Sequence, residues 1–175
     1  MSIKSIFLDR DGVINKEKNY LHKIADFEFI SGLFSSCKYF TSLNYKIIII
    51  TNQSGIARGY YTESDYQILN TWMLGEFKKN DIEILDIFHC AHLPESHCDC
   101  RKPKPGMLLT AKAKYNIDMK KSWMIGDKEN DIKAANNAGI TNTILVKSGH
   151  NIDEINSNAK FLLDSIKDIH QAIKF

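Results

Sequence analysis

The sequence predicts an α/β fold, in which a Rossmann-like parallel sheet carries helices on both faces. Strand-like and helix-like segments alternate along the chain, which is typical of a sheet with crossover helices. Residues 46–51 contain four consecutive isoleucines, a run typical of a strand buried on both faces. Several expected strands end in polar or acidic residues, as strands do where open α/β sheets bind ligands. The 175 residues are expected to form one domain, 1–175.

The first half of the chain is expected to supply two helices and the first two strands. Residues 5–8 form a short apolar run that predicts a strand, and the polar segment 12–29 predicts a loop or small hairpin over the site. Residues 33–43 carry apolar side chains at helical spacing and precede the isoleucine strand. A second helix is expected over 62–79, with Thr62 as its N-cap.

The second half is expected to contain three further strands and three helices. Pro105 suits the first turn of one helix, and Gly139 is a good terminator for the next. The strands are predicted at residues 84–90, 122–125 and 143–146. The helices are predicted at residues 105–115, 130–138 and 165–173.

Composition and charge exclude several classes of partner. Hydrophobic residues make up 43% of the chain and charged residues 25%, which is ordinary for a soluble globular protein. A net charge of +2 gives no indication of nucleic-acid binding, and no run approaches the ~20 apolar residues of a membrane span. Charged residues stand where a signal peptide would be apolar, so a cytoplasmic protein is expected. No long apolar stripe is left over, which favours a monomer.

Two carboxylates follow the first expected strand, at Asp9 and Asp11. Alternate residues of an extended chain point the same way, so both side chains can face one point. A hard cation such as Mg²⁺ would relieve their repulsion, and one of them would be free to attack phosphorus. The alternative is a solvated turn, since Asp and Gly are common in turns.

Hydroxyl and amide side chains follow the second strand, at Thr51, Asn52, Gln53 and Ser54. These neutral groups can hold a phosphate at a strand end. Taken alone, the segment is more typical of a polar turn.

Two cations precede the helix expected over 105–115. Lys102 is positioned in the sequence to neutralise Asp9 and a transferring phosphoryl group, and Arg101 to clamp a phosphate through two hydrogen bonds. The alternative is a solvated basic loop, against which the two neighbouring prolines argue because they stiffen the segment.

The fourth strand is followed by Asp127 and, four residues later, by Asp131. Asp127 would complete the Mg²⁺ site begun by Asp9 and Asp11. Asp131 is expected either to orient a metal-bound water or Lys128, or simply to cap a helix N-terminus, where acidic side chains are favoured.

Three cysteines and a histidine cluster after the third strand. Four sulfur and nitrogen ligands predict a closed structural Zn²⁺ site, formed by Cys90, His92, Cys98 and Cys100. The rival ligands are His89 and His97, and the alternative is free buried cysteines. This zinc loop, at about 90–102, would fix the segment that carries the two cations. Cys37 lies in a helical pattern and is expected to be a buried small hydrophobe.

The four segments that contain Asp9, Thr51, Lys102 and Asp127 together resemble the motifs of the haloacid dehalogenase superfamily of phosphatases. The resemblance implies that Asp9 is the nucleophile that forms an aspartyl phosphate, and that Asp11 is the general acid and then the general base. It implies that Thr51 and Lys102 bind the phosphoryl group. Mg²⁺ would be held by Asp9, Asp127 and the backbone carbonyl of Asp11. Protonation of the leaving group requires a raised Asp11 pKa beside the bound anion.

The zinc loop narrows the resemblance to the branch of D-glycero-D-manno-heptose 1,7-bisphosphate 7-phosphatases and histidinol-phosphate phosphatases, which have no large cap. The segment Asn-Gln-Ser-Gly-Ile-Ala-Arg-Gly at 52–59 resembles the heptose enzymes. It implies hydrolysis of the C7 phosphate of this small phosphosugar, a step in nucleotide-activated heptose and surface polysaccharide synthesis. The implied substrate contacts are Asn52, Gln53, Ser54, Arg58, Arg101 and Lys128.

Two other functions remain open at this point. The short spacing between His92 and Cys98 also occurs in the histidinol-phosphate branch. A non-catalytic phosphosugar-binding domain is the second alternative, against which the complete set of acidic residues argues.

Overall fold

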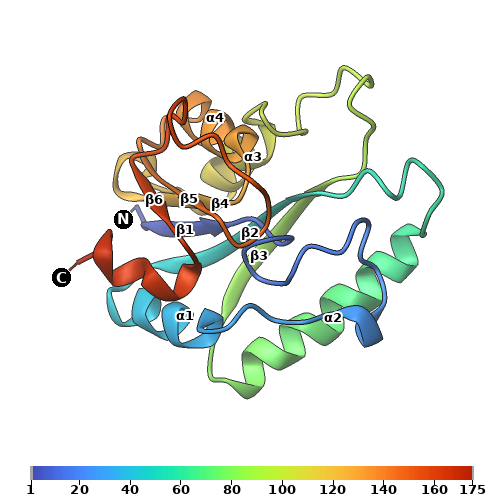
Figure 1. Ribbon diagram of the computed structural model, residues 1–175, viewed down its shortest axis with the longest axis horizontal. Coiled ribbons are helices and arrows are strands. Elements are labelled where there is room, and N and C mark those ends of the chain that lie inside the picture. Colours follow the sequence, from blue (N-terminus) through green and yellow to red (C-terminus); the bar gives the residue numbers. More distant parts are fainter. Residues whose placement is uncertain (1, 175) are drawn as a thin grey trace.

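The computed structural model describes residues 2–174, which form a six-stranded sheet between two layers of helices (Figure 1). The strands are β1 (Ser5–Leu8), β2 (Lys46–Asn52), β3 (Ile84–Cys90), β4 (Trp123–Gly126), β5 (Asn142–Val146) and β6 (Phe161–Leu163). The α-helices are α1 (Leu33–Ser42), α2 (Glu63–Lys79), α3 (Gly106–Tyr115) and α4 (Glu129–Asn137). Three short 3₁₀ helices are η1 (Ile24–Asp26), η2 (Met119–Lys121) and η3 (Ile166–Gln171).

The order of the strands creates a natural site for a ligand. The sheet runs β3-β2-β1-β4-β5-β6, and its neighbouring strands pair in parallel. The chain moves outward from β1 to β3, then returns and moves outward from β4 to β6 in the opposite direction. The order therefore reverses between β1 and β4, and ligands of open α/β sheets bind beyond the strand ends at such a point.

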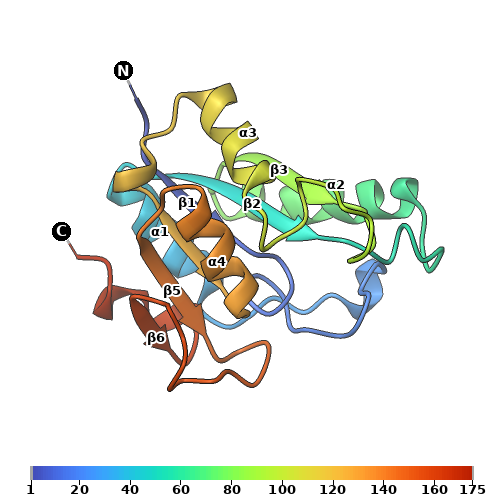
Figure 2. The same cartoon turned by 90° about the horizontal axis from the view of Figure 1, so that it is seen from above.

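The isoleucine strand is buried on both faces, as expected. Ile47 and Ile49 pack into the core on the side of α1, α2 and η3, whereas Ile48 and Ile50 pack into the core beneath α3 and α4. Turning the molecule brings α3 and α4 to the front, with α1 and α2 behind the sheet (Figure 2). Among residues 2–174, no helix combines the length and the apolar character needed to cross a membrane.

Local capping explains where several helices begin and end. Thr62 Oγ1 accepts a hydrogen bond from the Asp65 amide (3.1 Å), and the Thr62 amide donates to Asp65 Oδ2 (2.8 Å), so the expected N-cap is confirmed as a capping box. Gly139 follows α4 at a φ of 88°, the left-handed conformation expected of a terminator. Cys37 is fully buried in α1, as expected.

The C-terminal segment differs from the expectation of a helix over 165–173. The structure has the short strand β6, which the sequence did not predict, and then the 3₁₀ helix η3. The apolar residues Ile166, Ile169 and Ile173 recur every three or four positions and are buried, so the helical spacing of the sequence does correspond to a buried face, although the helix type differs. The tighter 3₁₀ turn aligns side chains at i and i+3, which places Ile166 and Ile169 on one face.

Candidate active site

The carboxyl ends of the central strands line a polar pocket of about 320 Å³. Of the residues singled out in the sequence, those that line the pocket are Asp9, Asp11, Asn52, Gln53, Ser54, Arg101, Lys102, Lys128 and Asp131. Thr51, Arg58 and Asp127 do not line it. Thr51 and Asp127 are buried, whereas Arg58 is exposed.

Three buried carboxylates converge next to one another, and two of them, Asp9 and Asp131, line the pocket. Asp9, Asp127 and Asp131 each offer an oxygen, and these atoms lie within 4.8 Å of one another. Burial, followed by the charge of Asp131, raises the pKa of Asp9 to about 6. Burial, followed by the charges of Asp9 and Asp131, raises the pKa of Asp127 to about 9. A divalent cation would relieve this repulsion. Asp127 Oδ1 is buried without a hydrogen-bond partner among residues 2–174, which fits a ligand of such a cation.

The ammonium group of Lys102 lies between two of these carboxylates. Its Nζ is 2.9 Å from Asp9 Oδ1 and 2.7 Å from Asp131 Oδ1. Burial alone would lower the pKa of Lys102, but the two carboxylates raise it. Lys102 is therefore a fixed buried cation beside Asp9, as the sequence predicted.

Asp131 caps a helix, one of the roles expected of it, and also holds a lysine that was not predicted as its partner. Its Oδ1 holds Lys102, and its Oδ2 accepts hydrogen bonds from the backbone amides of Asp127 (3.2 Å) and Lys128 (3.1 Å). Asp131 thus caps the N-terminus of α4, which the sequence offered as its alternative role, and it also orients Lys102, while its contact with Lys128 is to the backbone amide. Both roles follow from the place of Asp131 in the first turn of α4, just after the end of β4.

Asp11 is held by an unpredicted neighbour, the buried Arg10. Arg10 Nη2 donates to Asp11 Oδ1 (3.0 Å), as does Asn15 Nδ2 (3.0 Å), while Gln53 Nε2 donates to Asp11 Oδ2 (3.1 Å). Burial would raise the pKa of Asp11, but the charge of Arg10 and these hydrogen bonds lower it. Asp11 is thus a carboxylate in the free site.

The polar residues at the end of β2, which extends to Asn52, and just after it mostly bind other protein groups. Thr51 Oγ1 accepts a hydrogen bond from Gln53 Nε2 (2.9 Å), and Gln53 Oε1 accepts one from the Tyr61 hydroxyl (2.6 Å). Asn52 bonds to both backbone groups of Lys102, at 3.1 and 3.2 Å. These side chains therefore orient Asp11 and Lys102 in addition to lining the pocket.

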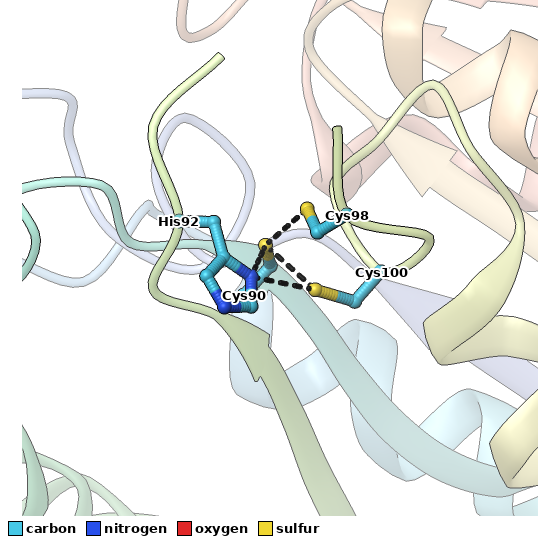
Figure 3. Close-up of side chains that lie close together, drawn as sticks. All are labelled: Cys90, His92, Cys98 and Cys100. Carbon is cyan, nitrogen blue, oxygen red and sulfur yellow. Dashed lines mark hydrogen bonds between the residues drawn. The ribbon is translucent and has the colours of Figure 1, made fainter. Parts of the chain in front are cut away.

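The predicted zinc ligands converge at the end of β3 and the loop that follows (Figure 3). Cys90 Sγ lies 2.9 Å from Cys100 Sγ and 3.7 Å from Cys98 Sγ, and His92 Nδ1 lies 3.2 Å from Cys100 Sγ. One atom from each of the four residues falls within 4.8 Å of the others, which suits a small tetrahedral ion. The rival ligand His89 instead pairs with Glu63, at 3.0 Å.

The same loop positions Arg101 at the pocket. Arg101 Nη1 donates to the backbone carbonyl of His92 (3.2 Å), and Lys104 Nζ donates to the carbonyl of Cys98 (2.7 Å). The cluster is thus linked by direct hydrogen bonds to the basic segment that follows it, as expected.

Six further residues line the pocket but were not predicted as site residues: Glu17, Asn19, Tyr20, Tyr61, Asn130 and His150. Most of them lie in irregular loops, where periodicity gives no information. Arg58 lies outside the lining, with its guanidinium carbon 5.9 Å from the centroid of the Tyr20 ring.

Comparisons with known proteins agree with this geometry. Residues 99–169 match the family model described as HAD-hydrolase-like. The chain is 53% identical to D-glycero-alpha-D-manno-heptose-1,7-bisphosphate 7-phosphatase of Photorhabdus laumondii, over 90% of each chain. It is 41% identical to D-glycero-beta-D-manno-heptose-1,7-bisphosphate 7-phosphatase of Escherichia coli K12, over 99% of this chain and 95% of that one.

A solved structure shares both fold and extent. The D,D-heptose 1,7-bisphosphate phosphatase of B. bronchiseptica, complexed with magnesium and phosphate, superimposes with a TM-score of 0.84 at 27% identity, over 97% of each chain. The predicted α/β class and the haloacid dehalogenase-like fold are thereby confirmed. The chain belongs to the heptose-1,7-bisphosphate 7-phosphatase family of the haloacid dehalogenase superfamily.

Proposed function

We propose that this protein is a Mg²⁺-dependent phosphatase that removes the C7 phosphate of D-glycero-D-manno-heptose 1,7-bisphosphate through an aspartyl phosphate on Asp9. The observation that carries the proposal is the position of Asp9 at the pocket floor, with Lys102 at 2.9 Å and Asp127 in the same buried cluster. A carboxylate can attack a phosphate only where their shared negative charge is offset.

The bound cation would lie against Asp9, Asp127 and the backbone carbonyl of Asp11, where it would supply charge stabilisation. An oxygen of Asp9 bonds to phosphorus as the bond from phosphorus to the C7 oxygen breaks, and Asp11 gives its proton to that oxygen. Water then attacks the phosphorus with Asp11 as its base, which frees phosphate and regenerates Asp9. Lys102 keeps its charge throughout.

Further residues, some lining the pocket and some beside it, are assigned as contacts of the phosphosugar. We assign Ser54, Arg101 and Lys128, which line the pocket, to the phosphate and sugar oxygens. Thr51 accepts from Gln53, so its own hydroxyl proton remains for the phosphoryl group. Arg58, which is outside the pocket lining but lies beside the lining residue Tyr20, is assigned to the distal phosphate.

The preferred anomer is proposed from relatedness. The relative named for the alpha anomer is 53% identical to this chain, and the one named for the beta anomer is 41% identical. We therefore propose the alpha anomer as the better substrate. The zinc loop is proposed to hold a structural Zn²⁺, because its four ligands leave no open position for chemistry.

The test is phosphate release in the presence of Mg²⁺ from three substrates: both anomers of heptose 1,7-bisphosphate, and histidinol phosphate. Asp9→Asn serves as the blank. We expect the largest kcat/KM for the alpha anomer. A preference for histidinol phosphate would overturn the substrate assignment. Release from none of the three would contradict the proposed function itself.

A further inference from the structure

His150, in the loop after β5, contacts the buried carboxylate of Asp127. Its Nδ1 lies 2.5 Å from Asp127 Oδ2, whereas Asp127 Oδ1 is buried and has no hydrogen-bond partner among residues 2–174. The two oxygens of one carboxylate thus have different environments. Holding Oδ2 fixes the rotation of the carboxylate and leaves Oδ1 for another partner.

The backbone around this contact is packed closely. A Cβ on Gly149 would lie 2.7 Å from the Gly12 Cα, and one on Gly12 would lie 2.9 Å from the Gly149 Cα. In both cases the added atom would also overlap the Asp127 carboxylate. Ser148 Oγ donates to the Gly12 carbonyl at 2.7 Å, which ties the loop after β5 to the loop after β1. Two glycines therefore confine the carboxylate that His150 contacts.

The opposite side of the imidazole ring also faces a carboxylate. His150 Nε2 lies 3.9 Å from Glu17 Oε2, so the ring stands between Glu17 and Asp127. Farther along the same loop, Ser157 Oγ (2.9 Å) and the Asn158 amide (3.0 Å) donate hydrogen bonds to Glu129, at the start of α4. The contacts of Ser148 near its start and of Ser157 and Asn158 near its end anchor the loop after β5.

We infer that His150 is a positioning residue, which holds Asp127 Oδ2 so that Oδ1 faces the divalent cation. This inference rests on the magnesium site of the proposed function. A neighbour that is hydrogen-bonded to a carboxyl ligand orients it before the ion arrives, so less order is lost on binding. His150 itself lines the pocket but is not assigned to the reacting atoms.

The test is calorimetric titration of the zinc-loaded protein with Mg²⁺ alone, in the absence of substrate. His150→Phe keeps a planar ring but removes the hydrogen-bonding nitrogen, and we expect its Kd for Mg²⁺ to rise by about tenfold or more. In His150→Asn the amide nitrogen occupies about the place of Nδ1, so this variant is expected to retain most of the affinity. His170→Phe, on η3, is the matched control and is expected to bind like the unchanged protein. His150→Ala provides a second variant without that nitrogen should the phenylalanine disturb folding.

Each outcome either supports or overturns the role of His150. Equal Mg²⁺ affinity of His150→Phe, His150→Ala and the unchanged protein would overturn the inference and leave the proposed function intact. A rise in KM without any change in Mg²⁺ affinity would instead make His150 a contact of the substrate. No Mg²⁺ binding by the unchanged protein would contradict the magnesium site, and the inference with it.

Discussion

The Nζ of Lys102 lies 2.9 Å from Oδ1 of Asp9, and both side chains are buried at the floor of the pocket. This pair places a permanent positive charge beside the carboxylate that we assign as nucleophile. A second carboxylate, Asp131, holds the ammonium from its other side at 2.7 Å. The position of Lys102 is therefore set before any substrate enters, which is the arrangement that stabilises charge without reorganisation.

Removal of this charge is expected to impair turnover. In Lys102→Met the carboxylates of Asp9 and Asp131 lose their shared counter-ion, so we expect kcat to fall by about 10²-fold or more. Lys112→Met, an exposed lysine on α3, is the matched control and should retain normal kinetics. The measurement is steady-state phosphate release with saturating Mg²⁺. A Lys102→Met enzyme with a normal kcat would show that the ammonium does not act on the transition state.

The zinc site gives a second prediction. The purified protein is expected to contain one Zn²⁺ per chain, and Cys98→Ser to lose it, because three ligands hold the ion less well than four. Loss of the ion should free the His92 carbonyl that accepts from Arg101, and so raise KM. His97→Asn is the control, since His97 is exposed and lies outside the cluster. Elemental analysis that finds zinc in Cys98→Ser but not in His97→Asn would contradict the ligand set.

The acidic cluster predicts how Mg²⁺ stabilises the protein at different pH values. Burial and mutual repulsion raise the pKa of Asp9 and of Asp127 above 3.8, to about 6 and about 9. Without Mg²⁺ the folded state therefore keeps protons that the unfolded chain has released. The free energy of unfolding is then expected to fall as the pH rises from about 4 to about 9.

Mg²⁺ competes with these protons, so its stabilising effect should grow with pH. We expect a fixed Mg²⁺ concentration to raise the Tm more at about pH 8 than at about pH 5, and Asp127→Asn to lose most of that difference. Thermal unfolding with and without Mg²⁺ provides the measurement. An equal rise in Tm at both pH values would show that the cluster is not where Mg²⁺ binds.

Arg58 tests the assignment of the distal phosphate. Arg58→Ala is expected to raise KM for heptose 1,7-bisphosphate several-fold and to leave kcat almost unchanged, because Arg58 does not line the pocket that contains Asp9 and Asp11. The same substitution should have little effect on heptose 7-phosphate, which lacks the second phosphate. An equal effect on both substrates would remove Arg58 from contact with the C1 phosphate.

Much of this site could be predicted because its residues follow strands. The apolar runs of β1, β2 and β4 are recognisable in the sequence, and polar side chains at their carboxyl ends must meet at one edge of a parallel sheet. Asp9 and Asp127 were predicted in this way, whereas Lys102 was predicted from its place in a basic segment before a helix. The cysteine cluster was found through residue type and spacing alone.

The rest depends on packing that the sequence does not show. The contact of Asp131 with Lys102 depends on side-chain direction in the first turn of α4, and that of Arg10 with Asp11 on side-chain direction in the turn after β1. His150 reaches the site from an irregular loop that no periodicity identifies. The strand β6 has only three residues, fewer than a pattern needs to stand out from its polar surroundings.

The measurement that tests the central claim most directly is the kcat of Asp9→Asn with heptose 1,7-bisphosphate and Mg²⁺. The asparagine keeps the size of the side chain but cannot accept the phosphoryl group as a carboxylate does. We expect kcat to fall by at least about 10⁴-fold, with folding and zinc content unchanged. Turnover within about tenfold of the unchanged enzyme would show that Asp9 is not the nucleophile.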